Sequence, residues 1–475
     1  MSLVSWEFAL FVVGALAVYF LLPRQLQNAW LLIVSYGFYI TLGWSFAVTL
    51  AVVTLANFWI AQQIEARRGT RNLWLRAGIV ANLALLLVFK AFDIVSPGLS
   101  LAFNAIGFVP ADPLKLLLPI GLSFAILQCV SYLVDVSRGQ VAASRSLIDF
   151  ALYLAYFPKL TSGPIERART FLPQLAGPRQ LDNAKLERAA ALIVIGLVRK
   201  AVIADALISV ISDGFVHHPL LAEENALSLA VQLALYGLYL FNDFAGYSSL
   251  VRGISLLFGI DLSPNFQTPY FARSFAEFWN QWHMSLTGWL RDYIFLPVSR
   301  ALIRRNPNPR WLPNILVPPL VTMIASGLWH SANLNMLVWG VLHGLFLAAE
   351  RLIAVFRPGL PVDKRPGWWQ ALSTLIVVTL ALLAWLPFSG SLTMVEAYVR
   401  AMLDWSRPVD YLPWPILWVA VPALALDWLQ FRAKDELVFL RWPLPARAGA
   451  LALAAILIVM TLMQGQIKVF VYQAF

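Results

Sequence analysis

The sequence predicts an all-α polytopic membrane protein, and three observations lead to that class. Of its 475 residues, 60% are hydrophobic and only 13% are charged, whereas soluble domains carry about a quarter charged residues. Apolar runs recur from one end of the chain to the other with short polar gaps. The runs also lack the alternation of membrane β-barrel strands, whereas helices satisfy their own backbone hydrogen bonds in lipid.

A helix needs about 20 apolar residues to cross the hydrocarbon core of a bilayer. Several of the apolar stretches are short enough to be tilted or to re-enter the bilayer. The first is interpreted as a retained anchor, because it carries Glu7, no basic cluster and no cleavage site. The stretches lie near residues 5–22, 29–43, 45–64, 73–95, 116–137, 187–212, 226–258, 312–330, 332–356, 368–388, 414–431 and 447–473.

Basic residues predict the orientation of these helices. The chain has 35 Lys and Arg against 25 Asp and Glu, a net charge of +10. Arg24, the arginines of 67–71 and those of 138–145 fall in alternate loops, and a further basic stretch runs from Arg300 to Arg310. The positive-inside rule makes these loops cytoplasmic. It therefore predicts an N-terminus outside the cytoplasm.

Several kinds of site are excluded by what the sequence lacks. The single cysteine, Cys129, rules out an internal disulfide and a cysteine-based metal cluster, and we predict no metal site. No P-loop, dinucleotide fingerprint or G-x-S-x-G elbow occurs. No internal repeat or linker is evident, so residues 1–475 are treated as a single membrane-embedded domain.

The region from about 147 to 300 differs from the rest, because Pro, Gly and charged residues interrupt its apolar runs. Two interruptions are Phe157-Pro158-Lys159 and the segment from Ser162 to Glu166. Non-helical backbone at membrane depth persists only where it is buried in protein or lines a watery cavity. This region is therefore predicted to contain a funnel or cavity.

Titratable side chains inside apolar stretches are functional candidates, because they are costly in lipid. The chain has five histidines. His217 and His218 lie in a polar loop and are interpreted as solvated. His343 lies in the middle of an apolar stretch without a local carboxylate, and a neutral buried imidazole there suits a general base. A hydrogen bond to a neighbouring helix is the structural alternative.

His330 closes the preceding apolar stretch. On one unbroken helix it would lie about 20 Å from His343, so direct cooperation requires a chain reversal. Asn333 and Asn335 favour a break after His330. The alternative for His330 is a packing or capping role at a helix end.

Two more polar positions are candidates. His283 lies in the aromatic, amphipathic segment 278–293, where Arg291 and Asp292 can pair, and a structural role is favoured for it. Asp243 is an acid inside a long apolar segment. It either pairs with a buried base or contributes to a cavity.

Five stretches of this sequence occur in the order found in the membrane-bound O-acyltransferase family. The sequence resembles that family from about residue 30 to 355, and most closely its bacterial branch of alginate and peptidoglycan O-acetylation membrane proteins. Residues 368–475 would add further transmembrane helices. The five stretches are Phe157–Arg167, Phe241–Ser248, Asn265–Tyr270, Phe278–Tyr293, and Gly327–His330 with His343-Gly344.

The resemblance implies a ring of about 11–12 transmembrane helices, with re-entrant or interfacial helices, around a central funnel and tunnel. It implies that His343 is catalytic and that His330 is its second polar residue. Further candidates for lining the tunnel or the donor site are His283, Asp243, Asn333, Trp329 and Arg291.

The resemblance also implies an O-acyltransferase of the bacterial inner membrane that takes acetyl groups from cytoplasmic acetyl-CoA, with no permanently bound cofactor. An extracytoplasmic SGNH or esterase-like partner would pass the group to an exported polysaccharide or peptidoglycan, and no nucleic acid is involved. The alternative is a transporter or flippase for a lipid-linked or polymeric sugar, since intramembrane His and Asp with broken helices fit one. A scaffold for an envelope complex is a third possibility.

Overall fold

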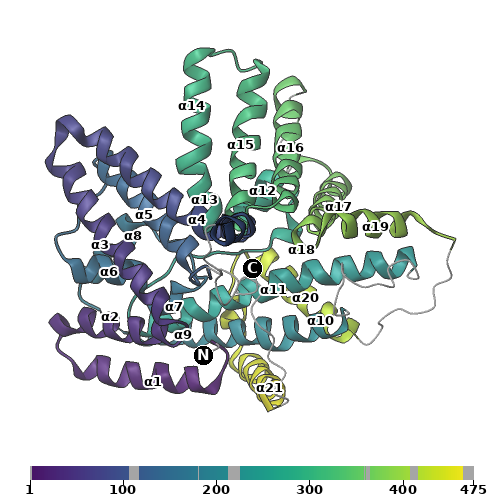
Figure 1. Cartoon of the computed structure of the whole chain (residues 1–475). Coiled ribbons are helices and arrows are strands. Elements are labelled where there is room, and N and C mark those ends of the chain that lie inside the picture. The colour runs from purple at the N-terminus through teal and green to yellow at the C-terminus, as the bar shows by residue number, and fades with distance from the viewer. Residues whose placement is uncertain are drawn as a thin grey trace. The chain divides into compact units, whose positions relative to one another are not determined.

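The computed structural model of the chain describes the backbone of residues 3–105, 117–179, 181–211, 225–357, 359, 364–406 and 416–463 (Figure 1). Every regular element in these ranges is a helix, and no strand occurs among the described residues. The all-α prediction is therefore confirmed.

Seven helices in the described ranges are long and apolar enough to cross a membrane. Two shorter apolar helices are α1 (Trp6–Leu21) and α5 (Leu122–Ser137). A polytopic membrane protein is thus confirmed, although several of the predicted stretches form helices shorter than a full span. The seven are Trp44–Ala66, Arg68–Phe92, Ala226–Leu257, Leu312–His330, Leu334–Phe356, Gly367–Ser389 and Leu444–Met463.

The chain divides into two compact units. Unit 1 comprises residues 1–182 and 254–262, and unit 2 comprises residues 183–253 and 263–475. The prediction of one membrane-embedded domain stays a prediction.

Unit 1 encloses the first interrupted segment of the sequence. Lys159, in the four-residue helix α7, is buried and donates a hydrogen bond of 2.5 Å to Gln128 Oε1. Its ammonium lies 5.2 Å from the ring centres of Tyr153 and Phe171. The broken backbone is therefore buried in protein. The helices of this unit are α1, α2 (Arg24–Ile40), α3 (Trp44–Ala66), α4 (Arg71–Ala105), α5, α6 (Leu147–Ala155), α7 (Phe157–Leu160) and α8 (Ala168–Ala176).

Unit 2 contains all the histidines that the structure describes. Its elements are α9 (Asn183–Leu197), the π-helix η2 (Val198–Ala204), α10 (Asp205–Val210), α11 (Ala226–Leu257), η3 (Pro269–Phe271), α12 (Phe275–Gln281), α13 (Met284–Leu290), the π-helix η4 (Arg291–Phe295), α14 (Leu296–Arg305), α15 (Leu312–His330), α16 (Leu334–Phe356), α17 (Gly367–Ala384), α18 (Leu386–Ser389), α19 (Leu392–Leu403), α20 (Leu417–Ala433), η7 (Val438–Arg441) and α21 (Leu444–Met463). The last four residues of α11 belong to unit 1.

Helices α15 and α16 form a tightly packed hairpin (Figure 1). A Cβ atom at Gly327 would overlap the carbonyl of Met336, and one at Gly340 would lie only 2.5 Å from the carbonyl of Met323. Small residues thus let the two backbones approach closely. Asn333 caps α16 by accepting a hydrogen bond of 2.9 Å from the amide of Met336. The predicted reversal after His330 is confirmed.

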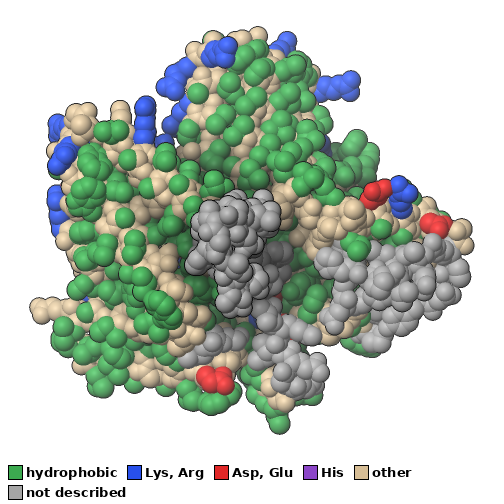
Figure 2. All heavy atoms as spheres, viewed as in Figure 1, with side chains coloured by type: hydrophobic (Ala, Val, Ile, Leu, Met, Phe, Trp, Pro, Cys, Tyr) green, Lys and Arg blue, Asp and Glu red, His purple; other side chains and the backbone are tan. Residues whose placement is uncertain are grey.

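The outer sides of this hairpin are apolar. Val321, Leu328, Leu345 and Ile353 are each at least 40% exposed. Figure 2 shows hydrophobic side chains over this part of the surface and Lys and Arg side chains near the outer end of α14. This distribution suits lipid contact along the helices and water or headgroup contact at their ends.

A buried polar network ties α20 to the π-helix η2. Arg199 donates hydrogen bonds to Asp427 (2.5 Å), Gln430 (2.7 Å) and Asn242 (2.7 Å). The side chains of Arg199 and Asp427 are only 4% and 2% exposed. Buried charges require such partners, because desolvation is costly. Helix α20 is therefore integral to unit 2.

Candidate functional site

His343 lies inside α16 and is completely buried, at 0% exposure. Its ring contacts Trp339 and Trp279 edge to face, at centroid distances of 4.8 and 5.0 Å. Phe346 and Trp385 lie at 5.8 and 6.2 Å. Neither ring nitrogen has a hydrogen-bond partner among the described residues. Four aromatic side chains therefore surround the imidazole. We call Trp279, Trp339 and Trp385 the tryptophan cage.

His330, the last residue of α15, adjoins this cage. Its ring lies 4.8 Å from Trp329, 5.5 Å from Trp339 and 5.4 Å from Phe388, each in an edge-to-face arrangement. Both candidate histidines thus contact one indole, Trp339. Because the chain reverses between α15 and α16, His330 and His343 are not held apart as they would be on one continuous helix.

His283 caps the N-terminus of α13 with left-handed backbone angles, φ 44° and ψ 53°. Its Nδ1 lies 3.1 Å from Asn265 Oδ1, and its ring contacts Phe244 and, at 6.4 Å, Trp329. Burial lowers the pKa of His283 to about 3, so the imidazole is neutral. A non-glycine residue in this region is strained, and such strain clusters at functional sites.

The other predicted residues have distinct surroundings. Trp329 contacts both His283 and His330, whereas Asn333 caps α16. Asp243 is fully buried and pairs with Lys200 at 2.7 Å, which matches the expected buried base. Arg291 is 61% exposed and pairs with the neighbouring Asp292 at 3.0 Å. His217 and His218 lie outside the described residues.

Sequence reasoning missed the tryptophan cage. Trp339 precedes His343 by one helical turn, so that spacing was visible in the sequence. Trp279 comes from α12, far along the chain from His343. Trp385 lies at the junction of α17 and α18 and has no such local signal. Its contact with His343 depends on tertiary packing.

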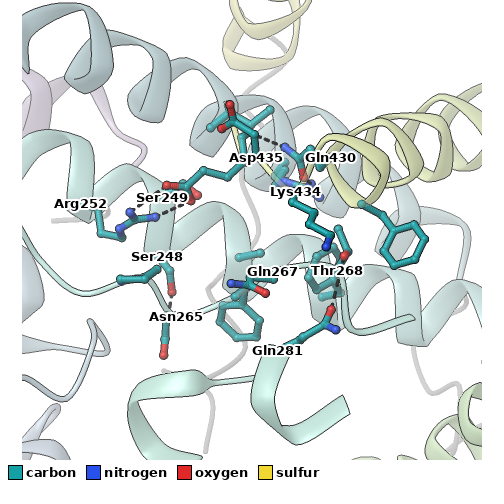
Figure 3. Close-up of a pocket in the computed structure, with 18 of the residues that line it drawn as sticks. Ser248, Ser249, Arg252, Asn265, Gln267, Thr268, Gln281, Gln430, Lys434 and Asp435 are labelled. Atoms are coloured by element: carbon teal, nitrogen blue, oxygen red, sulfur yellow. Dashed lines mark hydrogen bonds and ion pairs between the residues drawn. The ribbon is translucent and has the colours of Figure 1, made fainter. Parts of the chain in front are cut away.

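A polar cavity of about 590 Å³ lies beside this cluster, within unit 2 (Figure 3). Ser248 and Asn265 meet in its wall at 3.2 Å, and Arg252 forms a two-pronged ion pair with Glu436 at 2.6 and 2.9 Å. Asn265 also contacts His283, so one amide joins the cavity wall to the histidine region. The cavity falls largely within the region in which one was predicted. Its wall comes from α9, η2, α11, residues 264–268, α12, residues 430 and 431, and residues 434–436.

The arrangement suits proton transfer and stabilisation of negative charge. A neutral imidazole can accept a proton at one nitrogen and donate a hydrogen bond from the other. Aromatic walls exclude water and strengthen electrostatic interactions inside the site. No group of three or more His, Cys, Asp or Glu side chains in the described ranges is arranged to hold a metal ion.

These helices and the buried histidines define an integral membrane protein with a candidate enzymatic site. The chain matches the model of MBOAT, the membrane-bound O-acyltransferase family, over residues 30–386, and it belongs to that family. The match extends past the end predicted near residue 355. It stops before α19, α20 and α21.

The functions for which three relatives are named agree with this family. The probable alginate O-acetylase AlgI of Azotobacter vinelandii is 33% identical over 372 residues, which cover 78% of this chain and 72% of the relative. The peptidoglycan O-acetyltransferase of Helicobacter pylori is 28% identical over 377 residues (72% and 69%). The teichoic acid D-alanyltransferase of Streptococcus thermophilus is 30% identical over 295 residues (58% and 68%). The protein is therefore a membrane O-acyltransferase.

Proposed function

We propose that the protein moves an acetyl group from cytoplasmic acetyl-CoA across the bacterial inner membrane, toward an exported polysaccharide or peptidoglycan. The relatives named above act on alginate, peptidoglycan or teichoic acid, which supports a cell-envelope polymer as the final acceptor. A separate extracytoplasmic SGNH or esterase-like acetyltransferase receives the group. The N-terminus lies on the extracytoplasmic side.

One observation supports His343 as the catalytic base. Both of its ring nitrogens are buried without hydrogen-bond partners among the described residues. A buried polar group left in this state costs about 1–3 kcal/mol, and native structures rarely keep one without a reason. Reacting groups that bind beside His343 supply the missing partners.

The reaction uses the two histidines in different roles. His343 takes the proton of the acceptor hydroxyl while the oxygen of that hydroxyl attacks the thioester carbonyl. The new C–O bond forms, the C–S bond breaks, and the leaving coenzyme A thiolate accepts the proton from the imidazolium of His343. His330 donates a hydrogen bond to the oxyanion that develops on the carbonyl oxygen. The tryptophan cage limits hydrolysis by excluding water.

Access to His343 requires movement in this proposal, because the ring is fully buried. Trp279 comes from α12, and Trp385 lies between α17 and α18. A shift of either indole opens the cage to the thioester arm. Such side-chain and loop motions are slow enough to limit turnover in many enzymes.

Purified full-length protein incubated with radiolabelled acetyl-CoA tests the proposal. The wild type should cleave the thioester or transfer the label, and His343→Ala should lose about 10²–10⁴-fold of this activity. His217→Ala, in a stretch that the sequence predicts to be a polar loop, is the matched histidine control. Full activity of a folded His343→Ala variant contradicts the catalytic role. Polymer movement without thioester cleavage would favour the transporter alternative.

A further inference from the structure

Part of the wall of the polar cavity is formed by residues that lie beyond the region matched to the family. Residues matched to the family end at 386, whereas Gln430, Phe431, Lys434, Asp435 and Glu436 all line the cavity. The last turn of α20 and the residues just after it thus add polar and charged groups to a cavity that the matched region forms elsewhere. The C-terminal segment is positioned to influence what binds there.

Most charged groups in this wall are already engaged. Arg199 is bound by Asp427 and Gln430, and Arg252 by Glu436. Asp435 pairs with Arg441 at 2.7 Å.

Lys434 differs, because no described residue accepts a hydrogen bond or ion pair from its ammonium. Figure 3 shows its side chain extending into the cavity toward Thr268. This ammonium is therefore available to a ligand.

The backbone of Lys434 carries a second signal. Lys434 follows α20 with φ 51° and ψ 38°, the left-handed conformation in which helices usually end on glycine or asparagine. A lysine there is conformationally unfavourable. Strain of this kind is informative when the side chain points into a site. The side chain that stands in this conformation extends into the cavity, which points to a role for its ammonium.

The basic residues at the helix ends around the cavity indicate that this end of unit 2 lies on the cytoplasmic side of the membrane. Helix α9 begins beside the start of α21, and Arg447 pairs with Glu187 at 2.6 Å. The positive-inside rule assigns such basic helix ends to the cytoplasm. Phosphate-bearing metabolites lie on that side, whereas exported polysaccharides do not. The basic residues at these ends are Lys185, Arg188, Arg432, Lys434, Arg441 and Arg447.

We propose that this cavity binds the phosphate groups of a cytoplasmic ligand and that Lys434 recognises them. Hydroxyl and amide groups of Ser248, Thr268 and Gln281 line the same space, and its volume suits a small ligand. Identifying the ligand as the acyl donor rests on the proposed function. In that case Asn265, which contacts His283, lies on the side of the donor that leads toward the histidines.

Calorimetric titration of the purified full-length protein with unacylated coenzyme A tests the proposal. Lys434→Gln should weaken coenzyme A binding about tenfold, the loss of one charge-assisted hydrogen bond, whereas Lys434→Arg should retain it. Arg432→Gln is the matched control, because Arg432 is exposed and does not line the cavity. Pantetheine lacks the phosphates and should bind all four proteins equally.

Two results would overturn the proposal. One is equal coenzyme A affinity in the wild type and Lys434→Gln. The other is binding of short-chain phosphatidylglycerol, but not coenzyme A, in a Lys434-dependent manner, which would assign the phosphate to a lipid headgroup. Lys434→Gly controls for misfolding, because it removes the ammonium while glycine readily adopts the left-handed backbone conformation. It should lose the affinity without losing thermal stability. These experiments measure binding and need no acyl transfer. A negative result for Lys434 can therefore be told apart from a failure of the proposed function.

Discussion

His330 and His343 contact the same indole, Trp339, at centroid distances of 5.5 and 4.8 Å, although one ends α15 and the other lies inside α16. The close approach of the two helices at Gly327 and Gly340 makes this possible. Trp339 thereby fixes the surroundings of both candidate histidines. The integrity of the hairpin and of this indole should control activity.

Replacing Trp339 with Ala should lower acyl transfer about 10²-fold, because small displacements of catalytic groups have effects of that size. The KM for acetyl-CoA should change much less than kcat, since Trp339 is not part of the polar cavity. Trp368→Ala is the control, because Trp368 is 63% exposed. Steady-state kinetics of the two variants checks the prediction. A large KM change with unchanged kcat would contradict it.

Replacing Gly327 with Val should destabilise the α15–α16 hairpin by about 1–3 kcal/mol or more, as overpacking does. The added side chain would collide with the backbone of Met336, which cannot move away as a flexible side chain could. Gly449→Ala is the control, because nothing lies within 4 Å of a Cβ atom there. Thermal unfolding in detergent should show a lower Tm for Gly327→Val only. Equal Tm values for Gly327→Val and Gly449→Ala would contradict the prediction, because they would show that the two helices move apart without loss of stability.

Replacing Asp427 with Ala should destabilise unit 2 by about 3–5 kcal/mol, because Arg199 would remain buried without its ionic partner. The exposed pair of Arg400 and Glu396 offers a matched comparison. Arg400→Ala should change stability by less than about 1 kcal/mol. Chemical denaturation of both variants measures the difference. Similar losses would show that burial does not govern the strength of the Arg199–Asp427 interaction.

Stability should fall as the pH drops from about 6.5 toward 3, with a contribution from His283. Burial lowers the pKa of His283 to about 3, whereas the unfolded chain binds the proton near pH 6.5. In this window the unfolded state holds more protons, so unfolding is favoured at lower pH. His283→Asn tolerates the left-handed backbone and should flatten the pH dependence. Parallel Tm curves for wild type and variant would exclude this contribution.

Particular residues show what could be predicted and what could not. The end of α15 at His330 was predicted, and a buried base was one of the two alternatives for Asp243, because helix breaks and lone acids in apolar stretches are local signals. The partner itself, Lys200, was not named. The apolar stretch at 187–212 becomes α9, η2 and α10, whose π-helix buries Arg199 and Lys200. Lys200 also pairs with Asp205, five residues along the chain, at 2.8 Å. The other two partners, Asp427 and Asp243, lie much farther along the chain, so no local pattern identified them.

The sequence by itself determined that this protein is helical, membrane-embedded and a member of its family. Apolar length, charge placement and short motifs are properties of contiguous residues. Only the tertiary structure decided that His343 is enclosed by tryptophans, that His330 shares one of them, and that α20 completes the polar cavity. Those contacts join residues from distant helices, and they depend on side-chain packing that forms only when the helices assemble.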